Sequence, residues 1–224
     1  MKTETFAVGS LQIMAAVNPE YEDIAYILYP LDILRDWIEP TAQKYKVSIA
    51  VISNMNWDND LTPWPAPGES KGCADFKGNA PEFLKTLIGN VVPKIDRRYS
   101  LPKRMERTLV GVSLSGLFTL WQWAQIDTFK NIATLSGSFW YEGFEQWVFR
   151  QSFAGKRGKC YILLGNEEPY SNIPAYRKVG RCTENIVGCL HRQGVEVIYN
   201  IVPGNHYQFA LQRLNKAFGN LYDT

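Results

Sequence analysis

The chain has 224 residues, of which 46% are apolar and 21% charged, and its formal net charge at pH 7 is +2. This length allows one domain with a large core, and the composition is that of an ordinary globular protein. The small net charge does not indicate nucleic acid or an anionic membrane surface as a partner. No apolar run reaches membrane-spanning length, and the N-terminal residues include an acidic one and no long apolar segment. We therefore expect a single domain over residues 1–224, with neither a signal peptide nor a membrane anchor.

Alternating strand-like and helical stretches begin near the N-terminus. Residues 6–17 predict two short strands around Gly9 and Ser10. Ile24–Tyr29 and Val47–Ile52 are continuous apolar runs, which are typical of strands buried on both faces. Between these two runs, apolar residues at helical spacing over residues 33–45 predict a helix that is interrupted at Pro40.

The segment Ser53–Ala80 is rich in Asn, Asp, Pro and Gly, but it also contains Trp57, Trp64 and Phe76. A loop of this length within a compact domain usually serves a function or is disordered, and tryptophans argue against disorder. We therefore expect the loop to form one wall of a functional site. The alternative is a loop that only covers the edge of a sheet.

The second half of the chain continues the alternation. Residues 81–99 carry apolar side chains at steps of four and predict an amphipathic helix, bent or restarted near Pro93. Further strands are predicted at Leu109–Val112, Ile132–Leu135, Cys160–Leu164 and Val195–Val202, and further helices at Pro174–Gln193 and Tyr207–Tyr222. Buried strands that alternate with helices predict an α/β fold, in which a mostly parallel sheet is covered by helices on both faces.

Four cysteines are scattered through the chain: Cys73, Cys160, Cys182 and Cys189. They form no Cys-x-x-Cys pair, and no histidines stand at zinc-ligand spacing. Cys182 and Cys189 are seven residues apart in a helical stretch, which places both on one face and indicates core positions. We therefore expect a cytoplasmic protein with reduced cysteines and with neither a metal site nor a cofactor.

The segment from Thr108 to Phe118 joins a short apolar run to a helical pattern through small residues, with Ser113 at the turn. This is the layout of a nucleophile elbow, in which the serine adopts a strained, positive φ and tolerates only small neighbours. Gly111 meets this requirement on one side, and on the other side Ser115 stands where a second glycine is usual. The same pattern also fits a buried strand that runs into a closely packed helix and has no chemical role.

Three predicted strands are followed by side chains with catalytic potential, and such residues collect at the carboxyl ends of parallel strands. Ser113 follows the first strand, Glu167 and Glu168 the second, and His206 the third. The order serine, acid, histidine is that of the α/β-hydrolases. A serine hydroxyl is nearly inert at neutral pH until an imidazole accepts its proton, and the other histidine, His191, lies near the end of a helix. His206 is therefore the candidate base, and the alternative is a turn residue that caps the last helix.

Several segments match a known family in the same order: Tyr29–Asp32, Asp60–Trp64, Val92–Tyr99, Gly111–Gly116, Ser136–Trp140, Gly165–Pro169 and Pro203–Tyr207. In these segments the chain resembles the putative esterase family, which includes the enterochelin (ferric enterobactin) esterases and related siderophore and acyl-ester hydrolases. The resemblance spans most of the chain. It implies an α/β-hydrolase fold and the hydrolysis of a small-molecule ester.

The resemblance also implies roles for individual residues. Ser113 is the expected nucleophile, His206 the base, and Glu168, at the last position of a Gly-x-x-Glu pattern, the acid, with Glu167 as the alternative. Some relatives are thought to act with serine and histidine alone. We expect a two-step acyl transfer to water, in which the histidine first deprotonates the serine and later activates the water.

Two backbone N–H groups are expected to hold the oxyanion. One belongs to Leu114, the residue after the nucleophile, and the other to Leu31 or Asp32, because Pro30 has no N–H. Ile33 follows the aspartate, where the family commonly has glycine.

Aromatic and basic residues suggest how a substrate is bound. Trp64, Trp140 and Trp57 are expected to line a pocket suited to an aromatic or catecholate acyl group. A set of basic residues either attracts an anionic substrate or forms a solvated helix end and loop, which is the simpler interpretation: Arg97, Arg98, Lys103, Arg104 and Arg107.

Two alternatives to a siderophore esterase are open. The first is another acyl chemistry on the same machinery, such as a feruloyl or acetyl-xylan esterase, a thioesterase or an acyltransferase. The second is a catalytically silent protein that keeps the fold to bind a siderophore or a sugar ester. Ser115 in place of glycine and Ile33 near the oxyanion loop motivate this second alternative.

Overall fold

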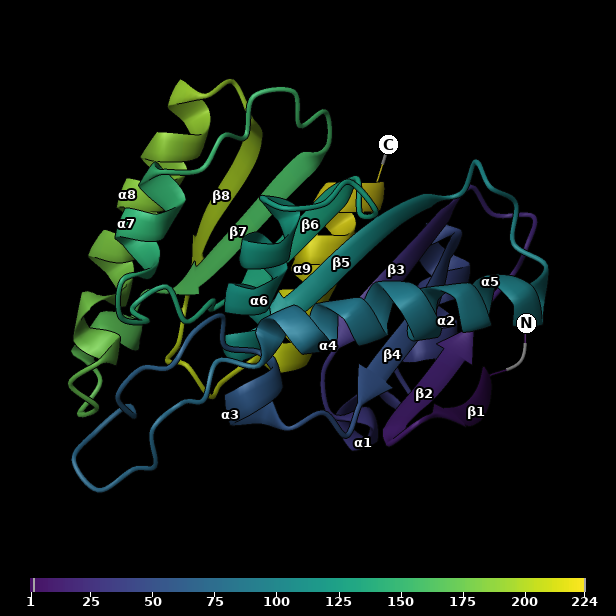
Figure 1. Cartoon of the computed structure of the whole chain (residues 1–224). Helices are drawn as coiled ribbons and strands as arrows, with labels where there is room; N and C mark the ends of the chain where they lie inside the picture. Colours follow the sequence, from purple (N-terminus) through teal and green to yellow (C-terminus); the bar gives the residue numbers. More distant parts are fainter. Residues whose placement is uncertain (2, 224) are drawn as a thin grey trace.

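The computed structural model describes residue 1 and residues 3–223, and the strands in this part of the chain form one eight-stranded sheet (Figure 1). The strands are β1 (Thr3–Val8), β2 (Leu11–Ala16), β3 (Asp23–Leu28), β4 (Val47–Ser53), β5 (Glu106–Val112), β6 (Asn131–Leu135), β7 (Lys159–Gly165) and β8 (Glu196–Val202). Their order in the sheet is β1-β2-β4-β3-β5-β6-β7-β8. β2 pairs antiparallel with β1 and β4, and all other pairs are parallel. The predicted α/β fold with a mostly parallel sheet is confirmed.

The strands at the centre of the sheet are buried on both faces. In β3 and β4, the two continuous apolar runs, every residue is buried except Asp23 and Ser53 at their ends. β8 is an edge strand, and its residues are only partly buried or exposed. Where helices cover the sheet from both sides, a polar side chain would lose its contact with water. This explains why the continuous apolar runs form the central strands.

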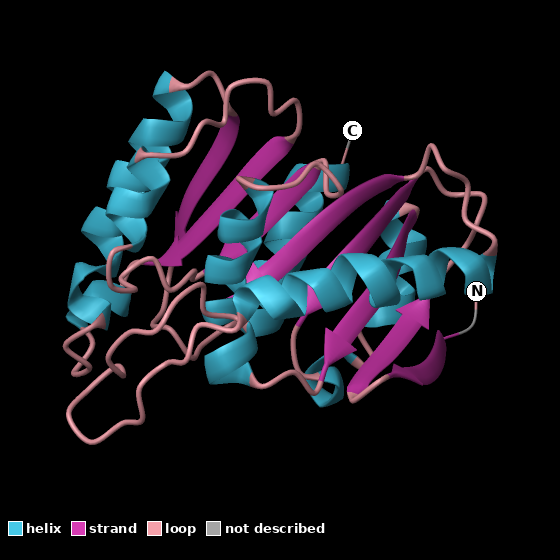
Figure 2. Ribbon diagram, in the orientation of Figure 1, coloured by secondary structure: helices cyan, strands magenta, loops and turns pink. Residues whose placement is uncertain are grey.

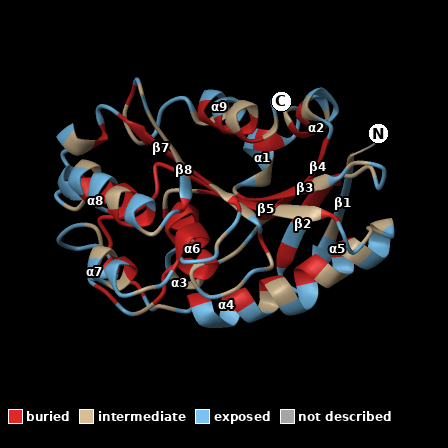
Figure 3. Cartoon of the chain, turned by 90° about the horizontal axis from the view of Figure 1, so that it is seen from above, coloured by how far each residue is buried: buried red, intermediate tan, exposed pale blue. Residues whose placement is uncertain are grey.

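Helices cover both faces of the sheet (Figure 2, Figure 3). One face carries α1 (Leu31–Leu34), α2 (Ile38–Tyr45) and α9 (Ala210–Tyr222), and the other carries α4 (Ala80–Thr86), α5 (Val92–Tyr99), α6 (Leu114–Trp123), α7 (Phe144–Phe149) and α8 (Val179–Arg192). Every residue of α6 is buried, so this helix lies wholly inside the second layer. No helix in the described part of the chain is long and apolar enough to cross a membrane.

Two predicted helices are divided differently from the expectation. The helix predicted over residues 33–45 breaks between α1 and α2, before Pro40, which lies in the first turn of α2. A proline is tolerated there because the N–H groups of a first turn have no acceptor within the helix. In residues 81–99, α4 and α5 are joined by the π-helical turn Leu87–Val91, which ends two residues before Pro93. The bend or restart expected near Pro93 is therefore a π-helical turn, which is wider than a regular α-helical turn.

Two other predicted helices begin later than expected. α8 is preceded by a 3₁₀ turn, Tyr176–Lys178, so the regular helix does not begin at Pro174. α9 begins after Phe209, whose φ of 62° is incompatible with a right-handed helix, so residues 207–209 belong to the preceding turn. Cys182 and Cys189 are buried within α8, as predicted, and all four cysteines of the described chain are unpaired.

The long loop after β4 has more local structure than its composition suggests. It contains the short helix α3 (Trp57–Asp60) and an antiparallel bridge between Ala66 and Phe76. The Trp64 indole packs against Trp147 of α7, and its N–H donates to the carbonyl oxygen of Glu142 at 2.9 Å. These contacts hold the loop against the α7 end of the molecule (Figure 1).

Candidate active site

Ser113 lies between β5 and α6 in a strained backbone conformation. Its φ and ψ are 59° and −123°, a region that favours glycine over residues with a Cβ. The turn is tight because a Cβ on Gly111 would lie 2.1 Å from the carbonyl oxygen of Ser115. The sequence Gly-x-Ser therefore folds into the predicted elbow, with the serine at its turn.

Ser115, which replaces the second glycine, stabilises this elbow. Its hydroxyl accepts the Val112 N–H at 2.7 Å. The same hydroxyl lies 2.8 Å from the carbonyl oxygens of Leu28 and Val112, to either of which it can donate. The side chain thus ties the elbow to the end of β3, and the departure from the usual motif does not disturb the turn.

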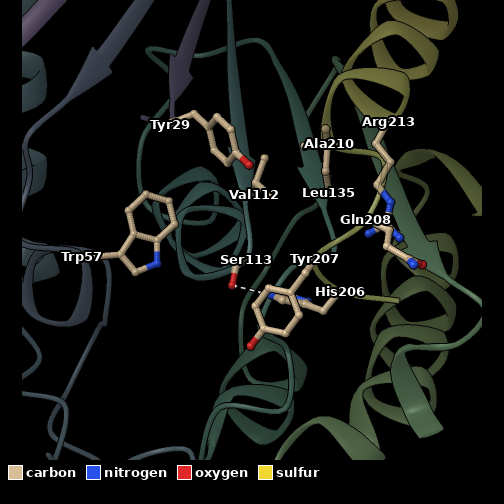
Figure 4. A pocket seen from close by; sticks show the side chains of 10 residues that line it. All are labelled: Tyr29, Trp57, Val112, Ser113, Leu135, His206, Tyr207, Gln208, Ala210 and Arg213. Carbon is tan, nitrogen blue, oxygen red and sulfur yellow. Dashed lines mark hydrogen bonds between the residues drawn. The ribbon is translucent and has the colours of Figure 1, made fainter. Parts of the chain in front are cut away.

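His206 follows β8 and faces Ser113. Its Nε2 lies 2.9 Å from Oγ of Ser113 (Figure 4). The His206 side chain is 8% exposed, and its ring packs against the buried ring of Tyr176, with 4.8 Å between the ring centroids. His191 is exposed at the end of α8. Of the two histidines, His206 is therefore the one that contacts the elbow serine.

Glu168 completes this hydrogen-bond path. Its Oε2 lies 2.8 Å from Nδ1 of His206, and its Oε1 accepts the Gly165 N–H at 2.7 Å. The side chain is 1% exposed, whereas Glu167, the alternative acid, is exposed. The structure thus brings Glu168 to the imidazole.

The surroundings of Glu168 keep it ionised. Burial acts to raise the pKa of its carboxyl group, but hydrogen bonds from His206, Ser136 and the Gly165 N–H outweigh burial, so the net pKa is lowered from 4.5. An ionised carboxylate only accepts hydrogen bonds, so Nδ1 of His206 must carry the proton that it donates to Glu168. Nε2 then has a lone pair that faces the Ser113 hydroxyl.

The structure adds two residues that the sequence analysis did not assign to the site. Arg213 on α9 is 3% exposed, and its Nη1 donates to Oε1 of Glu168 at 3.0 Å. The hydroxyl of Ser138, which is fully buried, lies 3.3 Å from that of Ser113. A signal for Arg213 exists in the sequence: it is a charged residue on the apolar face of the last helix, one turn before Ala217. Ser138 lies in one of the segments that match the family, but its spacing alone does not indicate a contact with Ser113.

A cavity of about 240 Å³ opens beside Ser113 and His206. Figure 4 shows its lining residues: Tyr29, Trp57, Val112, Ser113, Leu135, His206, Tyr207, Gln208, Ala210 and Arg213. Of the three predicted tryptophans, the structure brings only Trp57 to this cavity. Trp64 packs against Tyr141 and Trp147, and Trp140 is buried and packs against Tyr176, with 5.3 Å between the ring centroids.

The predicted oxyanion donors lie at the starts of two helices. Leu114 is the first residue of α6, and Leu31 and Asp32 are the first residues of α1. The N–H groups of a first helical turn have no acceptor within the helix. Leu31 and Asp32 line a neighbouring cavity that shares Tyr29 and Trp57 with the one beside Ser113. The second donor therefore stays a prediction.

The predicted basic residues lie away from this site. They belong to the end of α5 and the connection to β5, and Arg107 lies in β5 near its start, whereas Ser113 follows the end of that strand. Arg107 pairs with Asp96 at 2.8 Å, and Arg98 with Glu4 at 3.0 Å. None of the five basic residues lines the cavity beside Ser113, and all but the largely buried Arg107 belong to a helix end and the loop that follows it.

The chain is similar in sequence and in fold to several known proteins. Residues 31–180 match the family model described as Putative esterase. The protein YbbA of Bacillus subtilis (strain 168) is 23% identical in an alignment of 195 residues that covers 83% of this chain and 78% of YbbA. An IroE-like serine hydrolase from Shewanella oneidensis has a TM-score of 0.82 at 17% identity, over 99% of this chain and 80% of that one. Siderophore hydrolase EstB from Aspergillus nidulans has a TM-score of 0.73 at 15% identity, over 99% and 95% of the two chains. The two structures show a shared fold, and because the family model covers most of its length, the chain belongs to the putative esterase family.

Proposed function

We propose that this protein is a serine esterase that hydrolyses carboxylic esters through an acyl-enzyme intermediate. The observation that carries the proposal is the hydrogen-bond path from Ser113 through His206 to Glu168, with distances of 2.9 Å and 2.8 Å. Membership of the esterase family supports it. The strained serine, the oriented imidazole and the buried carboxylate are the three parts that activation of a hydroxyl requires.

The first half of the reaction forms the acyl-enzyme. Oγ of Ser113 attacks the carbonyl carbon of the ester as its proton passes to Nε2 of His206. Glu168 stabilises the imidazolium that forms. The N–H of Leu114 and a second N–H from Leu31 or Asp32 are the proposed donors to the oxyanion. The imidazolium then gives its proton to the departing alcohol oxygen.

The second half of the reaction hydrolyses the acyl-enzyme and regenerates the free Ser113 hydroxyl. Water loses a proton to Nε2 of His206 and attacks the acyl carbon, the oxyanion forms again, and Oγ leaves with the proton that the imidazolium returns. The carboxylic acid is released. The same three side chains therefore serve both steps, and no cofactor is needed in this scheme.

The proposed substrate is a siderophore ester of the enterobactin type or another aromatic acyl ester. Tyr29, Trp57 and Tyr207 line the cavity beside Ser113, and aromatic rings favour an aromatic partner. One structurally similar protein is named a siderophore hydrolase, which supports this substrate class. The unpaired cysteines agree with the further proposal of a reducing, cytoplasmic location.

The proposal is tested by ester hydrolysis. Wild-type protein should hydrolyse p-nitrophenyl acetate, and the Ser113→Ala variant should lose this activity and keep the circular dichroism spectrum of the wild type. Retained hydrolysis in the variant would rule out the mechanism. Incubation with an enterobactin-type trilactone beside short aryl acetates, followed by mass spectrometry of the products, tests the substrate class. A catalytically silent binding protein would leave all of these esters intact.

A further inference from the structure

Arg213 is a buried cation in an apolar setting. It is 3% exposed, and its neighbours on the buried side of α9 are apolar: Leu214, Ala217, Phe218 and Leu221. Burying a guanidinium costs free energy unless an opposite charge and several hydrogen-bond acceptors compensate it. The partners of Arg213 therefore indicate why a charge is present there.

The guanidinium of Arg213 contacts the loops that follow three successive strands. Nη1 donates to Oε1 of Glu168, after β7, at 3.0 Å, and also to the hydroxyl of Ser136, after β6. Nη2 donates to the carbonyl oxygen of Asn205, after β8, at 2.7 Å. Asn205 immediately precedes His206. One side chain thus joins the loop of the acid to the loop of the base.

These contacts also divide the two oxygens of Glu168 between different partners. Oε1 is held by Arg213 and the Gly165 N–H, which leaves Oε2 to accept Nδ1–H of His206. The fit is close, because a Cβ on Gly165 would lie 2.5 Å from Nη2 of Arg213. A neutral side chain of the same length would leave Glu168 with neither its charge partner nor this orientation.

We infer that Arg213 is a positioning residue of the site: it holds the Glu168 carboxylate oriented toward His206, and it fixes the turn that carries the imidazole. The inference rests on the proposed esterase function. Arg213 also lines the cavity beside Ser113, so direct contact with an anionic substrate is the competing role. The two roles differ in their kinetics. A positioning residue acts on kcat through Glu168, whereas a substrate contact acts on KM.

A double-mutant cycle separates these roles. Arg213→Met, Glu168→Gln and the double variant are assayed with neutral p-nitrophenyl acetate and with the anionic ester mono-p-nitrophenyl succinate, whose KM would report a direct contact with Arg213. Loss of orientation should lower kcat by about 100-fold in Arg213→Met, with KM unchanged. If Arg213 acts through Glu168, the double variant should be within about threefold of the slower single variant. Arg213→Lys, which keeps the charge but not the forked geometry, should recover part of the lost kcat.

A control variant on the same helix tests whether the loss of any charge lowers kcat. Lys216→Met removes an exposed charge from the same helix and should keep the wild-type kcat. Multiplicative losses in the double variant, or a raised KM with unchanged kcat in Arg213→Met, would overturn the inference. If Arg213→Met does not fold, the same cycle is run with Arg213→Lys. An inactive wild-type protein would refute the proposed function instead.

Discussion

The hydroxyl of Ser138 lies 3.3 Å from the hydroxyl of Ser113, and the Ser138 N–H donates to the Ser113 carbonyl oxygen at 3.0 Å. The direction of the first bond follows from the rest of the site. Because Glu168 fixes the proton of His206 on Nδ1, Nε2 must accept the Ser113 proton. The Ser138 hydroxyl is therefore left to donate to Oγ of Ser113.

This geometry predicts the effect of Ser138→Ala. Oγ of Ser113 gains negative charge when it leaves the acyl-enzyme, and a donor to that oxygen stabilises the charge. Removing the donor should lower kcat for p-nitrophenyl acetate by about tenfold, with little change in KM. Ser48→Ala is the matched control, because it removes another fully buried hydroxyl near the amino end of β4, whereas the site lies at the carboxyl ends of the strands. This variant should keep the wild-type kcat. An unchanged kcat in Ser138→Ala would show that this bond does not contribute.

The strain at Ser113 predicts a difference between two inactive variants. Glycine adopts a φ of 59° without steric cost, whereas alanine keeps the Cβ that causes it. Ser113→Gly should therefore be more stable than Ser113→Ala by about 1 kcal/mol. Urea unfolding of the two purified variants measures this difference. Equal stabilities would mean that the elbow stores no strain.

The lowered pKa of Glu168 predicts a pH-dependent stability. Because the folded-state pKa lies below the ordinary 4.5, the unfolded chain binds the proton first as the pH falls. The stabilisation by the carboxylate is therefore complete above about pH 4.5 and is lost as the pH falls through the folded-state pKa. The melting temperature of wild type minus that of Glu168→Gln should be largest near neutral pH and should shrink as the pH falls below 4.5. A difference that does not change over this range would contradict the assignment of an ionised Glu168.

Two glycines provide a test of the elbow packing. A Cβ on Gly111 would lie 2.1 Å from the Ser115 carbonyl oxygen, so Gly111→Ala should destabilise the fold by about 3 kcal/mol or more. Gly89 is exposed in the π-helical turn and has open space around it, so Gly89→Ala should be neutral or stabilising by about 0.5–1 kcal/mol. Thermal unfolding of both variants gives the comparison. Similar melting temperatures would mean that the elbow can open to accept a side chain.

The strands and the strand-end residues were predictable because their signals are local. A continuous apolar run such as Ile24–Leu28 requires cover on both faces, and the order of Ser113, Glu168 and His206 along parallel strands brings them to one edge of the sheet. Only the family's Gly-x-x-Glu pattern favoured Glu168 over Glu167, and no local physical signal made the choice. The choice depends on the 3₁₀ turn Glu168–Tyr170, which begins at one of them, with Glu168 buried and Glu167 exposed.

The residues that were misplaced depend on long-range packing. Trp64 and Trp140 are large aromatic residues, but their rings pack against Tyr141 and Tyr176 and do not line the cavity. Arg213 was missed because its partners come from three other loops. The apolar face of the last helix marks Arg213 as an unusual charge, but residue type and spacing do not indicate its partners or where the two indole rings pack, since both depend on how separate loops meet in space.

In the proposed mechanism, His206 activates the Ser113 hydroxyl for attack on an acyl centre. Diisopropyl fluorophosphate reports this directly, because it phosphorylates an activated serine and the adduct is located by peptide mass spectrometry. We expect a single adduct on Ser113, formed about 1000-fold more slowly in His206→Ala and at the wild-type rate in His191→Ala. No adduct on the wild-type protein, or an adduct on Ser113 whose rate does not depend on His206, would contradict the account.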